Sequence, residues 1–296
     1  MDIRQLQYLA ALAREKHFTR AAAACNVTQP TLSGRIRQLE QELGVPIVER
    51  GQRFIGLTPE GERVLRWAHL ILDNWNSLQS ELTQIKGKSS ALVGRIVLGV
   101  IPSALPMVSS LTRAMNAKHP AVDFTVLSHS SIDIIRGLND FSLDAGITYL
   151  DNEPVEGLQA KELYSEAYAL FMPKDHELAQ RKSVTWAEAS NQRLCLLTPN
   201  MQNRRIIDRA FAQAQVHPTA RVETNSIMNL LASVRSMDLC AIMPGYFEQT
   251  LGPLDGIAAV PLTEPSISHK VGLVTMARDP VPPLISALMN SVKALA

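Results

Sequence analysis

Apolar side chains at the start of the chain recur every three or four residues, which is the spacing of an amphipathic helix. Three such helices are expected, over residues 3–14, from Phe18 and from Thr28. Thr19 and Thr28 carry the hydroxyl groups expected of N-caps. The third helix has one apolar face, made by Leu32, Ile36, Leu39 and Leu43. Two helices joined by a tight turn predict a helix-turn-helix.

The opposite face of the third helix is polar. Burial of its apolar stripe leaves hydroxyl, amide and guanidinium groups on the outer side near its start, namely Thr28, Gln29, Thr31, Ser33, Arg35 and Arg37, with Pro30 in the first turn. Side chains of these types hydrogen-bond base edges in the major groove of DNA. The alternative is the solvated face of an ordinary helical domain, because exposed Gln, Ser and Arg are common.

Two short apolar segments, 46–48 and 54–57, flank a polar stretch directly after this helix. We expect a small hairpin, a wing, with Arg50 and Arg53 at its tip. Arginines in that position suit phosphates or a narrow minor groove. Such a turn considered by itself is more often a solvent-exposed loop, so it is its position after the third helix that favours a wing.

Thr58 and Pro59 then begin a long helix. Its apolar residues alternate four and three positions apart through three heptads: Val64, Ala68, Ile71, Trp75, Leu78, Leu82 and Ile85. This pattern predicts a coiled-coil seam between two chains, and a two-fold symmetric dimer implies a dyad-symmetric DNA site. The alternative is a core helix packed on its own domain. Residues 87–90 are expected to form a flexible linker.

From residue 93 onward, strand-like and helix-like segments alternate, which predicts doubly wound α/β units. The expected strands are 95–100, 122–128, 144–149, 168–172, 193–198, 221–224, 239–243 and 271–276, and the expected helices are 105–118, 132–139, 202–215, 227–236 and 284–294. Ligands bind such sheets at the carboxyl ends of the strands. Polar residues at these ends are therefore candidate ligand contacts: Ser103, Ser131, Thr198, Asn200 and Asn225. Helix N-termini favour anions, so a small anionic metabolite is predicted, although each residue would also serve as an ordinary cap or turn.

Length and charge refine this description. The 296 residues suggest two domains with a connecting element, and 46% hydrophobic content with 19% charge is typical of a globular protein. The net charge of +1 argues against a nucleic-acid partner only as an average. Residues 1–58 hold eight basic and five acidic side chains, so the expected DNA-binding segment carries +3 and the remainder −2.

Other classes of protein leave no signal. Cys25, Cys195 and Cys240 are far apart and form no C-x-x-C pair, so a disulfide framework or zinc site is not expected and a reducing cytosol is the simplest setting. No secretory signal and no long apolar run is present, so we expect a cytoplasmic protein without a membrane partner. No catalytic or nucleotide-binding motif occurs, so no enzyme and no cofactor is expected. A solute-binding module whose head contacts proteins and an α/β enzyme with a dimerisation helix remain the rival interpretations.

Residues 18–65, FTRAAAACNVTQPTLSGRIRQLEQELGVPIVERGQRFIGLTPEGERVL, closely resemble the DNA-binding signature of the LysR-type transcriptional regulators. The matching positions are Phe18 to Ala22, Thr28 to Pro30, Leu32, Ser33, Ile36, Leu39, Glu40, Leu43, Gly44, Arg50, Leu57 to Pro59 and Gly61. The chain departs from that signature with Cys25 in place of leucine, Ile47-Val48 in place of Leu-Phe, and Gly34 where several relatives carry a DNA-contacting arginine.

The resemblance implies an α/β protein with an α-rich winged helix-turn-helix head (1–58), a linker and dimerisation helix with its hinge (59–90), and a bilobed effector-binding domain like type 2 periplasmic binding proteins (91–296). The two lobes would be 91–162 plus 267–296, and 163–266. Ser103 and Ser131 match effector-binding positions of the family, and Tyr149 matches a position where some relatives place an arginine for an anion. The resemblance also implies a homodimer that pairs into a homotetramer, RNA polymerase as a further partner, and an effector that reorients the lobes and so changes how the heads are spaced on DNA.

Overall fold

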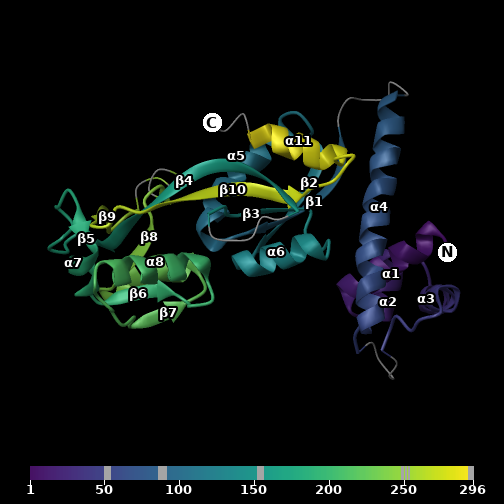
Figure 1. Cartoon of the computed structure of the whole chain (residues 1–296), viewed down its shortest axis with the longest axis horizontal. Coiled ribbons are helices and arrows are strands. Elements are labelled where there is room, and N and C mark those ends of the chain that lie inside the picture. The colour runs from purple at the N-terminus through teal and green to yellow at the C-terminus, as the bar shows by residue number, and fades with distance from the viewer. Residues whose placement is uncertain are drawn as a thin grey trace. The chain divides into compact units, whose positions relative to one another are not determined.

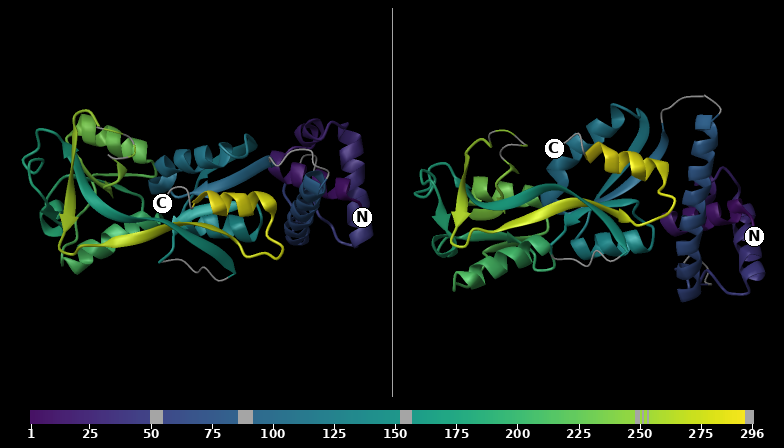
Figure 2. Two further views of the ribbon diagram at one scale, coloured as in Figure 1. Left: turned by 90° about the horizontal axis from the view of Figure 1, so that it is seen from above. Right: turned by 45° about the horizontal axis from the view of Figure 1, so that its top comes forward.

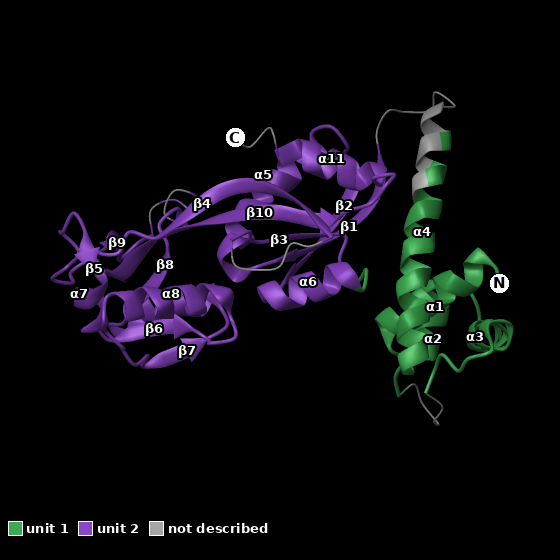
Figure 3. Cartoon of the chain, viewed as in Figure 1, with its two compact units in different colours: residues 1–90, 140–142 green, residues 91–139, 143–296 purple. Residues whose placement is uncertain are grey.

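The computed structural model describes residues 1–49, 55–85, 92–151, 157–247, 250, 252 and 254–292. Two compact units make up the chain (Figure 3). The first comprises residues 1–90 with 140–142, and the second comprises residues 91–139 with 143–296. The first is helical and the second is α/β, in agreement with the predicted fold class.

The first unit contains four helices among its described residues: α1 (Ile3–Glu15), α2 (Phe18–Ala24), α3 (Gln29–Leu43) and α4 (Pro59–Ile85) (Figure 1). Asp2 caps α1, because its carboxylate accepts from the Gln5 amide at 2.8 Å while the Gln5 side chain accepts from the Asp2 amide at 2.6 Å. The cap of α2 is His17 and not the expected Thr19, since Nδ1 of His17 accepts from the Thr19 amide. Thr28 caps α3 as predicted.

One apolar core holds this unit together. The buried face of α3 contributes Leu32, Ile36 and Leu39 as predicted, but Leu43, the fourth residue of the predicted stripe, is 39% exposed and is not part of it. Ala21 and Ala22 are buried in α2, where their small side chains let the neighbouring helices approach closely. The described part of the expected hairpin is a single antiparallel bridge between Val48 and Leu57, and its tip, with Arg50 and Arg53, lies outside the described residues.

Hydrogen bonds of Thr58 and a close backbone contact of Gly61 hold the start of α4 against the segment 46–47. Oγ1 of Thr58 accepts from the Gly61 amide at 2.9 Å and donates to the Pro46 carbonyl at 2.6 Å. A Cβ on Gly61 would lie 2.1 Å from the carbonyl oxygen of Ile47, so only glycine fits this contact. The long helix therefore leaves the core with a direction set by backbone contacts.

The second unit has two lobes, each built on three parallel strands. In the first lobe β1 (Val93–Val100) lies between β2 (Ala121–Ser128) and β3 (Ala145–Tyr149), with η1 (Pro102–Ala104), α5 (Leu105–Asn116) and α6 (Ser131–Asn139). In the second lobe β6 (Leu194–Leu197) lies between β7 (Val222–Thr224) and β8 (Cys240–Pro244), with α8 (Gln202–Gln213) and α9 (Ile227–Met237). Most of these elements lie within two residues of their predicted bounds.

Two long antiparallel strands, β4 (Leu158–Pro173) and β10 (Ser268–Met276), join the lobes and run side by side in Figure 2. From Leu158 to Ala167, β4 pairs with β10, and from Tyr168 it pairs with β8 and β9 (Ile257–Thr263). The passage between lobes thus lies between Ala167 and Tyr168, later than the predicted boundary after residue 162.

Several elements of the second unit were not expected from the sequence. The prediction included only the buried end of β4, and it omitted β5 (Val184–Thr185), α7 (Trp186–Ser190) and β9. The first half of β4 alternates exposed and half-buried residues, and β5 and α7 are short, so their hydrophobic signal is weak. The last helix, α11 (Pro283–Ser291), matches its prediction.

Candidate DNA-reading helix and effector cleft

The outer face of α3 carries the residues expected to read DNA. Thr28, Gln29, Pro30, Thr31, Arg35 and Arg37 are exposed, and Ser33 is half-buried. Oγ1 of Thr28 and Oγ1 of Thr31 lie 2.8 Å apart and hydrogen-bond each other. The guanidinium of Arg35 lies 3.1 Å from Oε1 of Gln38 and 3.6 Å from Oδ2 of Asp2. These are solvent-exposed contacts and cost little to exchange for a phosphate or a base.

A buried carboxylate sets the position of α3 against the segment that follows it. Oε1 of Glu40, a residue only 8% exposed, accepts hydrogen bonds from the amides of Ile47 (2.8 Å) and Val48 (3.2 Å). These bonds fasten the first strand segment of the hairpin to α3. Reasoning from the sequence placed Glu40 only in a family signature and gave it no structural role. The sequence feature that could have indicated this role is the position of Glu40 directly beside Leu39, a residue of the apolar stripe of α3.

The apolar residues of α4 divide into two sets. Val64 and Ala68 pack on the core of their own unit, where Val64 is half-buried and Ala68 is fully buried, so the Ala68 side chain has no exposed surface for an intermolecular seam. Ile71, Trp75, Leu78 and Leu82 are between 36% and 46% exposed, and Trp67, which the heptad pattern omitted, is 66% exposed. The helix extends through Ile85, whose side chain lies outside the described residues. The exposed stripe therefore begins at Trp67.

Between the lobes of the second unit, the ends of strands and the starts of helices enclose a small cavity. Ser103, Ser130, Ser131 and Tyr149 line it from the first lobe, and Gln202 and Asn203 line it from the start of α8 in the second lobe. Five of these six residues are at most 5% exposed, and Ser130 is 8% exposed. The space inside is about 10 Å³, which is room for one water molecule at most. The lobes are closed on each other here.

A polar cluster of five buried residues, Ser103, Tyr149, Glu166, Tyr168 and Asn203, lies behind this inner cavity. The Tyr149 hydroxyl donates to Oε1 of Glu166 at 2.5 Å. Nδ2 of Asn203 donates to the Tyr149 oxygen at 3.2 Å and to Oε1 of Glu166 at 3.4 Å. The cluster thus joins the second lobe to the first and to β4 between them. In addition, the Tyr246 hydroxyl donates to the Ser103 carbonyl.

Burial dominates the electrostatics of the cluster. Desolvation raises the pKa of Glu166 to about 7, although the hydrogen bonds it accepts oppose that shift. The pKa of Tyr149 is well above its usual value because of burial and the neighbouring Glu166 carboxylate. Glu166 was not among the predicted site residues, since it lies in the middle of the strand whose first half the hydrophobic pattern did not indicate.

A larger cavity of about 470 Å³ opens beside the inner one. Its lining is mixed, with Ser128, His129, Ser130, Asp133, Asn200, Asn225 and Ser226 among its polar residues and Leu105, Met201, Ile227 and Met228 among its apolar ones. Of the predicted effector contacts, Ser103, Ser131 and Tyr149 therefore line the inner cavity, and Asn200 and Asn225 line the outer one. Thr198 lines neither, although its buried hydroxyl has no hydrogen-bond partner.

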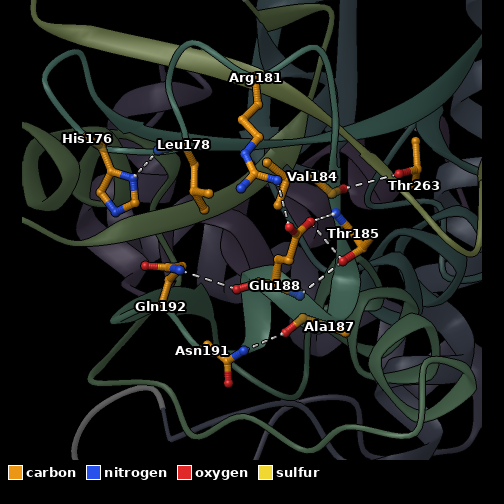
Figure 4. Close-up of polar contacts among 10 residues, drawn as sticks. All are labelled: His176, Leu178, Arg181, Val184, Thr185, Ala187, Glu188, Asn191, Gln192 and Thr263. Atoms are coloured by element: carbon orange, nitrogen blue, oxygen red, sulfur yellow. Dashed lines mark hydrogen bonds and ion pairs between the residues drawn. The ribbon is translucent and has the colours of Figure 1, made fainter.

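The polar contacts around α7, drawn in Figure 4, form a helix cap. Oγ1 of Thr185 accepts from the Glu188 amide at 3.1 Å, and Oε2 of Glu188 accepts from the Thr185 amide at 2.9 Å. Arg181 pairs with Oε1 of Glu188 at 2.9 Å. Both carboxylate oxygens and the Thr185 hydroxyl are thus engaged in local bonds, and the network is complete without a ligand.

The three thiols lie in surroundings that suppress their reactivity. Cys195 and Cys240 are buried and Cys25 is half-buried, and desolvation raises the pKa of each thiol, to about 12 for Cys240. His176 does not act as a base toward Cys240. Its Nδ1 accepts from the Leu178 amide (Figure 4), so the ring proton is on Nε2, 3.8 Å from Sγ of Cys240.

Within the described ranges, no group of three or more His, Cys, Asp or Glu side chains is placed to hold a metal ion. The same part of the chain contains no helix that is both long and apolar enough to cross a membrane.

Comparisons with known proteins match both units. Residues 3–62 match the model of the bacterial regulatory helix-turn-helix proteins of the lysR family, and residues 89–296 match the LysR substrate binding domain. The hydrogen peroxide-inducible genes activator of Dickeya chrysanthemi is 28% identical over 297 residues, covering 99% of this chain and 95% of that protein. The regulator XapR of Escherichia coli is 30% identical over 234 residues, which is 79% of each chain.

Solved structures agree over nearly the whole chain. A full-length OxyR variant from Pseudomonas aeruginosa is 26% identical with a TM-score of 0.78, covering 99% of this chain and 98% of the other. CbnR in complex with its target DNA is 19% identical with a TM-score of 0.69 and shares the fold over the full length of both chains.

Proposed function

Because the chain belongs to the LysR family of DNA-binding transcriptional regulators, we propose that α3 reads DNA while the cleft of the second unit receives the controlling signal. Like its relatives, the protein is a transcriptional regulator and not an enzyme. The observation that carries the proposal is the exposed polar start of α3, a helix whose opposite face is buried in the core of the first unit. Thr28, Gln29, Pro30, Thr31, Ser33, Arg35 and Arg37 are the proposed contacts, and Arg50 and Arg53 remain predictions.

We propose that two copies of the chain dimerise through the exposed stripe of α4, which we define as Trp67, Ile71, Trp75, Leu78 and Leu82. An exposed row of large apolar side chains at three- and four-residue spacing is the surface from which a helix pair is built. A dimer would place two heads on a dyad-symmetric site. Membership of the family supports three further proposals. The dimers would pair into a homotetramer, the protein would contact RNA polymerase, and it would lie in the cytoplasm with the chromosome.

The signal proposed here is a small molecule bound without covalent chemistry. Some relatives carry hydrogen peroxide in their names, and hydrogen peroxide oxidises cysteine in its thiolate form. In this chain, burial raises the pKa of all three thiols, so little thiolate exists near neutral pH. The cleft, in contrast, has Ser103, Ser131 and Tyr149 on its inner lining and Asn200 and Asn225 on its outer lining. Binding there would change how the lobes close and so bias one arrangement of the assembled chains.

The test of DNA reading uses the full chain. A duplex selected by the protein from a random-sequence pool serves as the probe, and its affinity is measured by fluorescence anisotropy at several salt concentrations. Gln29→Ala should weaken binding to the selected duplex by roughly 5- to 100-fold with little effect on unrelated DNA. Arg95→Ala, which removes an exposed arginine of the effector domain, is the control. Equal affinities for both variants would exclude α3 as the reading element.

A further inference from the structure

The hydrogen bonds in the cleft orient the protons of its lining residues. Tyr149 has one hydroxyl proton, and it is donated to Glu166, so toward any other group the Tyr149 oxygen can only accept. Asn203 directs its amide nitrogen at Tyr149 and Glu166, which leaves its carbonyl oxygen as its remaining polar atom. The Ser130 hydroxyl donates to Oδ2 of Asp133 at 2.6 Å and likewise retains only lone pairs. Asn203 and Ser130 therefore offer acceptors to the cavity, whereas the Tyr149 oxygen already accepts from Asn203 and has the Ser103 and Tyr168 hydroxyls at 3.3 and 3.4 Å, so it has no proton to donate to a ligand.

The charge of the cleft points in the same direction. Among the described residues that line the two cavities there is no lysine or arginine, and the buried Glu166 lies one hydrogen bond behind the inner cavity. Asp133 lines the outer cavity, but it is exposed and pairs with Arg136 at 3.2 Å, so its charge is balanced. The guanidinium of Arg205 donates to Oε1 of Gln202 at 2.6 Å and to the Asn200 carbonyl at 3.2 Å, so Gln202 can present its amide nitrogen as a donor. An anion in the inner cavity would approach the buried carboxyl group of Glu166, and none of the residues that line this cavity is a lysine or arginine that could balance the added charge.

Two buried polar atoms at the cleft have no hydrogen-bond partner. Oγ of Ser131, which lines the inner cavity and is 1% exposed, has no hydrogen bond, and neither has Oε2 of Glu166, which is fully buried. Such groups normally find partners, because leaving one unpaired in the interior costs about 1–3 kcal/mol. A ligand that opened the lobes far enough to enter would reach Ser131 first and bring donors toward the carboxyl group.

We propose that the effector is an uncharged or positively charged molecule that donates hydrogen bonds, such as an amide or an amine, and not the anionic metabolite that the helix N-termini suggest. This rests on the proposed function of the cleft as the effector site. The helix starts alone favour an anion, but at the inner cavity the buried Glu166 carboxyl group and the committed protons of Tyr149, Asn203 and Ser130 outweigh that preference.

Matched fragments test the proposal on the full chain. Each set consists of a carboxylate, the corresponding carboxamide and the corresponding amine on one ring, for example benzoate, benzamide and benzylamine, and saturation-transfer NMR reports which of them bind. Two variants block the cleft: Ser131→Leu at the inner cavity, and Met201→Trp at a half-buried residue that lines both cavities and is the safer substitution for folding. Ser109→Leu, at an exposed position of α5, is the matched control.

The expected result is that amides and amines bind the wild type and the control and lose at least ten-fold in affinity in the blocked variants, while carboxylates show no loss. Carboxylates that lose affinity on blocking would overturn the proposed ligand class and leave the effector site in place. If no fragment of any charge depended on the cleft, both the ligand class and the effector site would be excluded, while DNA binding, measured separately, would still test the function of α3.

Discussion

The hydroxyl of Tyr149 at the end of β3 donates a 2.5 Å hydrogen bond to Glu166 in the middle of β4, and both side chains are completely buried. Because β4 continues into the second lobe, this bond lies at the junction through which any relative movement of the lobes must pass. Asn203 completes the junction from the second lobe. The charge state of one carboxyl group is thereby linked to the closed form of the cleft.

The stability of the effector domain should depend on the protonation of Glu166. The folded pKa of about 7 lies above the ordinary value of 4.5, so the folded state binds the proton more tightly between these values. The contribution of Glu166 to the free energy of unfolding is therefore fully present below pH 4.5, falls as the pH rises and is lost above pH 7. Its full size is about 3 kcal/mol.

Thermal unfolding of wild type and Glu166→Gln from pH 5 to pH 8 measures this effect. As the pH rises, the Tm of the wild type should fall relative to the Tm of the variant, because glutamine has no proton to lose. Taking the difference cancels the titration of all other groups. A difference that stays constant with pH would show that Glu166 keeps one protonation state throughout this range.

Gly61→Ala should destabilise the head. The new methyl group would lie 2.1 Å from the Ile47 carbonyl oxygen, and the backbone must move to accept it, at a cost of about 3 kcal/mol. Hydrogen–deuterium exchange of peptides from α1 and α3 should show faster exchange, with peptides from the second unit unchanged.

The matched control for that substitution is Gly34→Ala. A Cβ there has no neighbouring atom within 4 Å, and alanine is the better helix former, so α3 should gain up to about 1 kcal/mol and exchange more slowly. Similar exchange in both variants would mean that the Ile47 contact does not constrain the start of α4.

Leu78→Glu should weaken the dimer. This side chain is 46% exposed in the stripe of α4, and a carboxylate in an apolar seam must be desolvated without a partner. Sedimentation velocity of the full chain over a range of protein concentrations should show at least a ten-fold rise in the dissociation constant.

Two controls accompany this measurement. Val93→Glu alters an exposed apolar residue outside the stripe and should leave association unchanged. Val64→Ala should lower the stability of the head without changing association, because Val64 packs on the core of its own unit. Dimers of undiminished strength in Leu78→Glu would place the interface elsewhere.

The thiols should resist modification in the native protein. In iodoacetamide at pH 7.5, Cys195 and Cys240 should remain unlabelled and Cys25 should react slowly, since burial removes access and raises each thiol pKa. Peptide mass spectrometry checks this, with all three labelled in urea as the control. Correspondingly, hydrogen peroxide should leave DNA affinity unchanged. Rapid native labelling of Cys195 or Cys240 would revive a thiol-based signal.

Much of the architecture was readable from local pattern. The caps at Thr28 and Thr58, the stripe of Leu32, Ile36 and Leu39, and the alternation of strands and helices depend on residues close together in the chain, so their signals survive without knowledge of the fold. The exposed polar face of α3, which we propose reads DNA, belongs to this class, because burying one face of a helix determines the other. The prediction was wrong at two helix ends: Leu43, in the last turn of α3, is exposed, and His17 caps α2 in place of Thr19.

The tertiary structure alone decided which apolar residues of α4 are buried and how the cleft is charged. Val64 and Ala68 follow the same spacing as Leu78 and Leu82, and only the packing of α1 against α4 separates the two sets. Glu166 is distant in sequence from Tyr149 and Asn203, and their contact arises because β4 crosses from one lobe to the other. The sequence by itself determined most of the helices and strands and the exposed polar face of α3, whereas the polarity of the proposed effector site came from long-range contacts that no local pattern encodes.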